Sequence, residues 1–247
     1  MTSTDFSAVV WKEWKEIILE RSAGGSGFYR PLLLIAILGV FLPLRTGPER
    51  FFSPSQLPLY VFFSALVVTA VIADSIAGER ERHTLETLLA SRLSDRAILL
   101  GKIAASIAYG WLIAMLCVLF GVVTVNVTNW QGHVLIYRDW ASWLILLLGP
   151  PLAAGTVATA GVLVSLRAAT VRQAQQTLAV GFVVVFFGAV FGANMLPAAW
   201  KQWLAGILAA WPPARLVLAA AGVVLLVDLM LLVAVMARFE REKLVLD

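Results

Sequence analysis

Six long apolar stretches occupy most of this chain, and they constrain its fold more than any other feature. They cover residues 28–45, 57–77, 97–125, 143–166, 177–193 and 216–237. A helix needs about 20 apolar residues to cross the roughly 30 Å hydrocarbon core of a bilayer. The composition agrees, because 60% of the residues are hydrophobic, against about 45–50% in a soluble domain. We therefore predict an all-α integral membrane fold with six transmembrane helices and no separate soluble domain.

The first 27 residues have a different character. Apolar side chains recur at three- and four-residue spacing from Phe6 to Ile18, and charged side chains take the other side. This spacing predicts an amphipathic helix, and its low overall hydrophobicity favours a position in the membrane interface, against lipid. Packing on a partner protein is the alternative. A flexible Gly- and Ser-rich joint follows at 22–27, so the expected division is 1–27 and a single transmembrane domain at 28–247.

The basic residues indicate the orientation in the membrane. Most of the 19 Lys and Arg residues fall in the loops and ends that share one side with both termini. Positive residues resist translocation and accumulate on the cytoplasmic side. The excess of positive charge is spread over the ends of apolar segments rather than gathered in one block, so it does not indicate nucleic-acid binding. We expect both termini in the cytoplasm.

Prolines mark two departures from a simple series of spans. Gly149-Pro150-Pro151 lies inside the fourth apolar stretch and is expected to kink or split that helix, because proline removes a backbone donor. Between the fifth and sixth stretches, an apolar face that includes Trp200, Trp203 and Trp211 precedes Pro212-Pro213. This segment is too short to span. We predict an outer or re-entrant helix there, with a partial seventh span as the alternative.

The longest charged stretch between spans runs from Gly78 to Lys102. Within it Leu85, Leu88, Leu89 and Leu93 form an apolar stripe at helical spacing, which predicts a short amphipathic helix over 79–93. Its polar side would hold the i,i+4 pairs Glu79/His83 and Arg82/Glu86, and Ser94 or Asp95 would cap the next helix. A helix so rich in charges of both signs favours a protein partner as the cover of its apolar edge.

Three motifs in this stretch resemble the membrane subunits, or permeases, of type-2 exporters among the ABC transporters. They are Gly78-Glu79-Arg80-Glu81, Thr84-Leu85-Glu86-Thr87-Leu88-Leu89 and Gly101-Lys102, the last opening the third span. Ser91-Arg92 stands where that family usually has a proline. The resemblance implies a cytoplasmic coupling helix that docks on an ATPase subunit, with these contact residues: Glu79, Arg80, Glu81, Arg82, Thr84, Leu85, Glu86, Leu88 and Leu89.

The same resemblance implies a function and a set of partners. The chain would be a permease in a prokaryotic cytoplasmic (inner) membrane, moving substrate outward, with two ABC ATPase subunits, a second permease copy or close homologue, and membrane lipid around it. The sequence has no GxxxxGK[ST] phosphate loop, so we expect no enzyme activity or cofactor in this chain, and ATP and Mg bound by the partner. The alternative is a mechanotransmission or maturation-complex subunit that carries no cargo. The substrate stays open.

A few intramembrane residues are candidates for further roles. Asp228 lies near the middle of the sixth stretch, where an ionised carboxylate is costly; it belongs either to a translocation path or gate, or to a bond that holds helices together. Gly188 and Gly192 form a GxxxG pair that permits close helix packing. His83 and His133 fall on opposite sides of the membrane and Cys117 is the only cysteine, so we expect no metal site.

Overall fold

The computed structural model describes residues 3–23, 26–84, 92–130 and 132–238. These residues form helices and no strands. Within these described ranges, six helices are long and apolar enough to cross a membrane: Pro31–Phe51, Pro54–Glu81, Asp95–Thr128, Trp140–Ser165, Val171–Met195 and Pro213–Arg238. The predicted all-α integral membrane fold with six transmembrane helices is confirmed. Leu85, Glu86, Leu88 and Leu89, for which a partner contact is expected, lie outside the described residues.

The elements follow one another as a series of long helices, several of them interrupted. In chain order they are α1 (Ser3–Ala23), α2 (Ser26–Leu34), η1 (Ile35–Phe41), α3 (Leu42–Phe51), η2 (Pro54–Gln56), α4 (Leu57–Ala73), η3 (Asp74–Gly78), α5 (Glu79–Glu81), α7 (Asp95–Thr128), α8 (Trp140–Ser165), α9 (Val171–Met195), α10 (Ala198–Ala210) and α11 (Pro213–Arg238). The first crossing joins α2, the π-helix η1 and α3, and the second joins α4, the π-helix η3 and α5.

Most helices extend beyond the apolar stretches that predict them. The second crossing continues through Glu79–Glu81, and α7 begins at Asp95, where the Ser94 hydroxyl accepts a hydrogen bond from the Ala97 amide. Of the two predicted caps, Ser94 and Asp95, it is therefore Ser94 that caps α7. Hydropathy marks where apolar side chains stop, whereas backbone hydrogen bonds and caps decide where a helix stops. Gly101-Lys102 consequently lies within α7 and not at its start.

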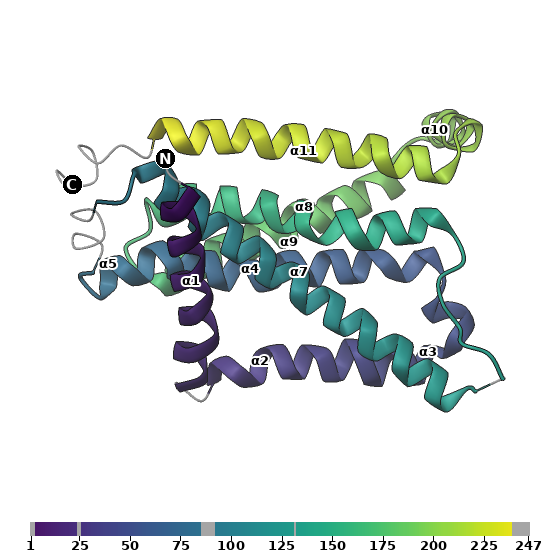
Figure 1. The fold of residues 1–247 in the computed structure, drawn as a ribbon. Coiled ribbons are helices and arrows are strands. Elements are labelled where there is room, and N and C mark those ends of the chain that lie inside the picture. Colours follow the sequence, from purple (N-terminus) through teal and green to yellow (C-terminus); the bar gives the residue numbers. More distant parts are fainter. Residues whose placement is uncertain (1–2, 24–25, 85–91, 131, 239–247) are drawn as a thin grey trace.

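The long helices lie side by side, and α1 runs across them at one end of the bundle (Figure 1). We call this end, where α5 also lies, the α1 end. The opposite end, which holds α3 and α10, is called the α10 end. The core is built by α4, which packs on α7 and α8. Glycines allow this approach: a Cβ on Gly110 of α7 would stand 2.6 Å from Val68 Cγ2. In contrast, α9 and α11 lie at the edge and leave most of their apolar side chains exposed.

The prolines end one helix and leave another intact. α10 is exposed along its whole length and stops before Pro212, and Pro213 then takes the first position of α11, where a missing amide costs nothing. The predicted separate helix between the fifth and sixth spans is present. In contrast, α8 continues through Pro150 and Pro151 as one helix, so it is not split. There the Ser64 hydroxyl of α4 donates to the Pro150 carbonyl, at 3.2 Å.

Candidate functional site

The second crossing ends at the α1 end in a tight, hydrogen-bonded turn. The Thr84 amide donates to the Glu79 carbonyl (2.9 Å) and the His83 amide to the Arg80 carbonyl (3.1 Å). This pair of bonds is the Schellman pattern that closes a helix, and it requires a left-handed residue. His83 supplies it with φ of 55°, a conformation that His adopts more readily than most side chains.

This turn changes the prediction for residues 79–84. Glu79–Glu81 are the last turn of the second crossing rather than the first turn of a separate helix, and the chain leaves the helix at Arg82–Thr84. Glu79 and His83 therefore do not form an i,i+4 pair. The sequence pattern missed this because charged residues are compatible with a helix, and a left-handed residue other than glycine has no strong signature.

Glu79 points inward and pairs with Lys102 of α7. The Lys102 ammonium donates to Glu79 Oε1 (3.0 Å), to Glu13 Oε1 of α1 (2.6 Å) and to the Ser75 carbonyl (2.7 Å). Glu79 is 4% exposed and Lys102 is 2% exposed. Three acceptors for the three ammonium protons satisfy this buried cation. Glu79 is therefore unavailable to a partner protein, contrary to the expected docking contact.

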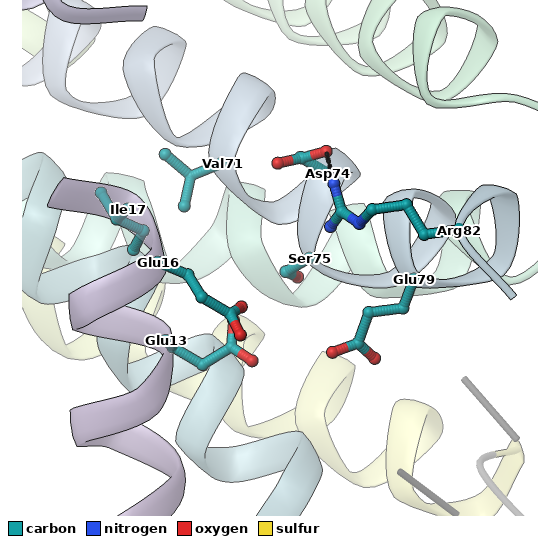
Figure 2. A pocket seen from close by; sticks show the side chains of 8 residues that line it. All are labelled: Glu13, Glu16, Ile17, Val71, Asp74, Ser75, Glu79 and Arg82. Carbon is teal, nitrogen blue, oxygen red and sulfur yellow. Dashed lines mark ion pairs between the residues drawn. The ribbon is translucent and has the colours of Figure 1, made fainter. Parts of the chain in front are cut away.

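A second lysine extends this group into a charged cluster, which comprises Lys12, Glu13, Glu16, Glu79 and Lys102. The Lys12 ammonium lies 3.1 Å from both Glu16 Oε1 and Glu79 Oε1. Burial raises the pKa of Glu13, against the opposing effect of Lys102. Figure 2 shows Glu13 and Glu16 of α1 approaching Glu79 across a small cavity, of about 190 Å³. The three carboxylates could together hold a cation, but they are already paired with the two ammonium groups.

The next two residues connect the same turn to α8 and α9. The Arg80 guanidinium donates to the Leu166 and Ala168 carbonyls, at 3.1 and 3.0 Å, just beyond the end of α8. Glu81 Oε1 accepts from the Val171 amide, the first of α9, at 2.9 Å. A cation at a helix C-terminus and an anion at an N-terminus are both favourable. Glu79, Arg80 and Glu81, which we call the clamp, thus join the second crossing to α1, α7, α8 and α9.

The exposed surface beside the clamp is formed by Arg82, His83 and Thr84. Arg82 pairs with Asp74 two helical turns back, at 3.6 Å. Gly78 lies beneath this pair, and a Cβ there would stand 2.5 Å from Asp74 Oδ1. The glycine that opens the first motif therefore makes room for the Asp74–Arg82 bridge.

Lys12 and Glu13 were not predicted as site residues from the sequence. Lys102 was named only as part of the Gly101-Lys102 motif, without a role for its side chain. A signal for Glu13 was present: it lies four residues from both Val9 and Ile17, and all three are buried on one face of α1. A carboxylate in the middle of an apolar stripe indicates a buried partner.

Gly101 of α7 explains how Glu13 reaches its partner Lys102. Its missing side chain admits Val9, because a Cβ would stand 2.5 Å from Val9 Cγ1.

Asp228 lies elsewhere, on α11 facing α8. The Thr156 hydroxyl donates to Asp228 Oδ1 at 2.6 Å. The carboxylate lines an apolar cavity of about 780 Å³ that α7, α8 and α11 surround. This cavity shares no lining residue with the one at the charged cluster, so the structure separates the two predicted sites. Gly188 and Gly192 face open space on α9, where a Cβ on either would meet no described atom of this chain within 4 Å.

The fold and the clamp define the class: a polytopic helical membrane protein with an exposed charged turn tied to several of its spans. Residues 4–220 match the family model of the ABC-2 type transporter. The chain belongs to this family, as a permease subunit, and the family implies an ABC ATPase as partner. It is the transmembrane component and not the ATPase. None of the curated sequences compared matches the chain.

Proposed function

We propose that this chain is the permease subunit of an ABC exporter, driven by ATP hydrolysis on a separate subunit. In this proposal the α1 end faces the cytoplasm of a prokaryotic cell, with the protein in its cytoplasmic (inner) membrane and both termini inside. Two ATPase subunits bind ATP and Mg and dock there, and a second permease copy or close homologue completes the transporter. The observation that carries the proposal is the clamp, which lies directly behind the exposed turn at Arg82–Thr84.

The clamp explains how force on a short segment would reach the spans. A partner bound to residues 82–93 pushes on the end of the second crossing, and that end holds α1 and α7 through Glu79 and holds α8 and α9 through Arg80 and Glu81. The Glu79–Lys102 salt bridge is buried from water, and breaking it would leave an uncompensated charge. The contacts of Arg80 and Glu81 are charge-assisted hydrogen bonds to backbone groups, half-buried for Arg80 and exposed for Glu81. The proposed docking residues are Arg82, Thr84, Leu85, Glu86, Leu88 and Leu89, while Glu79, Arg80 and Glu81 transmit the motion.

Charge reversal of exposed residues tests the docking. Arg82 and Arg92 are exposed at the α1 end, and Arg138 is exposed beyond the α10 end of α7. The tagged double variant Arg82→Glu/Arg92→Glu should lose most of the ATPase subunit that co-purifies from native membranes, while Arg138→Glu should retain it. An equal loss in both variants, or retention in both, would reject docking at this end. Glu79 is unsuitable for this test, because its reversal would disrupt the charged cluster itself.

Direction is tested separately, in inside-out membrane vesicles that contain the complex. ATP added outside such vesicles should drive substrate into the lumen, which corresponds to export from the cell. Accumulation that requires ATP inside the lumen, or that is unaffected by ATP, would contradict the proposed direction. A panel of apolar and amphipathic labelled compounds serves as cargo.

A further inference from the structure

The large cavity beside Asp228 has the form of a binding site for a small molecule. Its volume of about 780 Å³ lies within the roughly 300–1,000 Å³ of typical ligand pockets. α11 packs on α8, and α8 packs on α7, so α8 forms the back wall between the other two helices. Phe6 of α1 lies at one end of the cavity and Gly222 lines it further along α11. The cavity therefore extends from the α1 end past the middle of α8 and α11.

The cavity is accessible from the membrane side. Leu225 and Leu229 of α11 line it and are still 49% and 48% exposed. Gly222 also lines it, with no described atom within 4 Å of the position its Cβ would take. An occupant can therefore enter sideways from lipid without first crossing the polar α1 end.

Among the described residues that line the cavity, Asp228 is the only one with an ionisable side chain. The lining also includes the Thr159 hydroxyl, but this group donates to the Gly155 carbonyl of its own helix, at 2.9 Å. The remaining lining side chains carry no charge and are mainly apolar. The cavity thus offers one carboxylate on an otherwise apolar wall.

The carboxylate is held in place but not neutralised by a protein cation. Thr156 donates to Oδ1, and Oδ2 lies 2.9 Å from the position of a Cβ on Gly155, so the absence of a side chain there makes room for it. No salt bridge to Asp228 occurs within residues 3–23, 26–84, 92–130 and 132–238. A carboxylate at this depth favours a positive counter-charge, and the apolar wall around it favours an apolar body on that charge.

We propose that this cavity binds an apolar organic cation, with its positive charge against Asp228 and its hydrocarbon groups against α7, α8 and α11. That such a cation is the exported cargo rests on the proposed export function, whereas its binding in the cavity does not. Anionic amphiphiles are excluded by the carboxylate. A phospholipid fits poorly, because its hydrocarbon tails would lie against Asp228 while its headgroup stayed at the membrane surface.

The test is equilibrium binding of radiolabelled tetraphenylphosphonium to the purified chain in phosphatidylcholine nanodiscs, with empty nanodiscs as the blank. We expect saturable binding that weakens at least about tenfold in Asp228→Asn, since loss of one ionic contact at a desolvated site is worth a factor of that order or more. Glu49→Gln, which removes an exposed carboxylate outside the cavity, should leave binding unchanged. Triphenylphosphine oxide, an uncharged relative of the cation, should compete only weakly.

A second variant keeps the test decisive if Asp228→Asn assembles poorly. Gly222→Leu fills the cavity and retains the carboxylate, so it should also weaken binding of the cation. Unsaturable binding, equal affinity in Asp228→Asn, or equally strong competition by uncharged triphenylphosphine oxide would each overturn the proposal. No ATPase is present in this assay, so a failure of binding is distinct from a failure of transport. Binding of the cation without its ATP-driven uptake in inside-out vesicles would count against the cation as cargo and not against the binding site.

Discussion

Lys102 shows how strongly one residue can determine the packing of several helices. Its ammonium group is buried and gives one hydrogen bond each to α1, η3 and α5. Replacing it with Met would leave the carboxylates of Glu13 and Glu79 buried beside an apolar side chain. Removing one partner of such a buried pair costs about 3–5 kcal/mol.

We therefore expect Lys102→Met to lower the thermal midpoint of the purified chain strongly, and Lys102→Met with Glu13→Gln and Glu79→Gln to recover part of the loss. The measurement is intrinsic-fluorescence melting in detergent. Lys15→Met, which alters another lysine that is exposed on α1, is the control. A single variant that melts like the unmodified chain would show that the cluster contributes little.

His83 carries the left-handed turn that ends the second crossing. Glycine adopts this conformation without strain, whereas a β-branched side chain is strongly disfavoured in it. His83→Gly should melt at the same temperature or higher. His83→Val should melt roughly 2–8 °C lower, because a left-handed residue costs about 1–2 kcal/mol and each kcal/mol shifts the midpoint by about 2–4 °C in a chain of this size. His133→Val, at an exposed position toward the α10 end, should leave the melting temperature unchanged. If the two valine variants melt at the same temperature, the left-handed turn at His83 does not contribute to stability.

At the scale of elements, two glycine positions have opposite surroundings. A methyl group on Gly101 would collide with Val9 of α1, while one on Gly188 would meet no described atom of this chain. Gly101→Ala should therefore loosen α1 from α7 and expose α1 to limited proteolysis, and Gly188→Ala should not. Identical proteolysis of the two alanine variants would contradict the packing of α1.

The GxxxG pair on α9 carries a separate prediction. Gly188→Leu with Gly192→Leu should weaken self-association of the chain, measured by cross-linking in membranes, if α9 packs on a second copy.

Arg80 is the connection between the second crossing and the end of α8. Ala168, one of its two carbonyl partners, is 4% exposed. In a chain with Ala168→Cys and Cys117→Ala, adding Arg80→Gln should speed maleimide labelling of residue 168 about tenfold or more, because hydrogen bonds to a charged group contribute about 1.5–3 kcal/mol. Arg82→Gln, at a side chain that pairs with Asp74 instead, is the matched control. An unchanged labelling rate would show that the clamp does not hold this loop.

At the scale of the whole molecule, hydropathy predicts the crossings well and the site only in part. Six apolar runs of sufficient length gave the six spans, and the Trp-rich segment before Pro212 gave α10. The partners of Arg80 and Glu81 could not be predicted, since they are backbone groups of residues 166, 168 and 171. Backbone groups carry no sequence signature, and which of them a side chain reaches depends on how the helices pack. The end of the helix at His83 escaped prediction for the same reason.

Site-directed photo-cross-linking tests whether the α1 end of the bundle, which carries the clamp, receives the ATPase. Cys117 is the only cysteine and is buried, so Cys117→Ala provides a background in which Arg92→Cys or Lys201→Cys carries a photoreactive maleimide. Both positions are exposed, at opposite ends of the bundle. We predict an ATPase adduct from position 92 and none from position 201 in native membranes. An adduct from position 201, or none from position 92 while the ATPase co-purifies, would contradict this prediction.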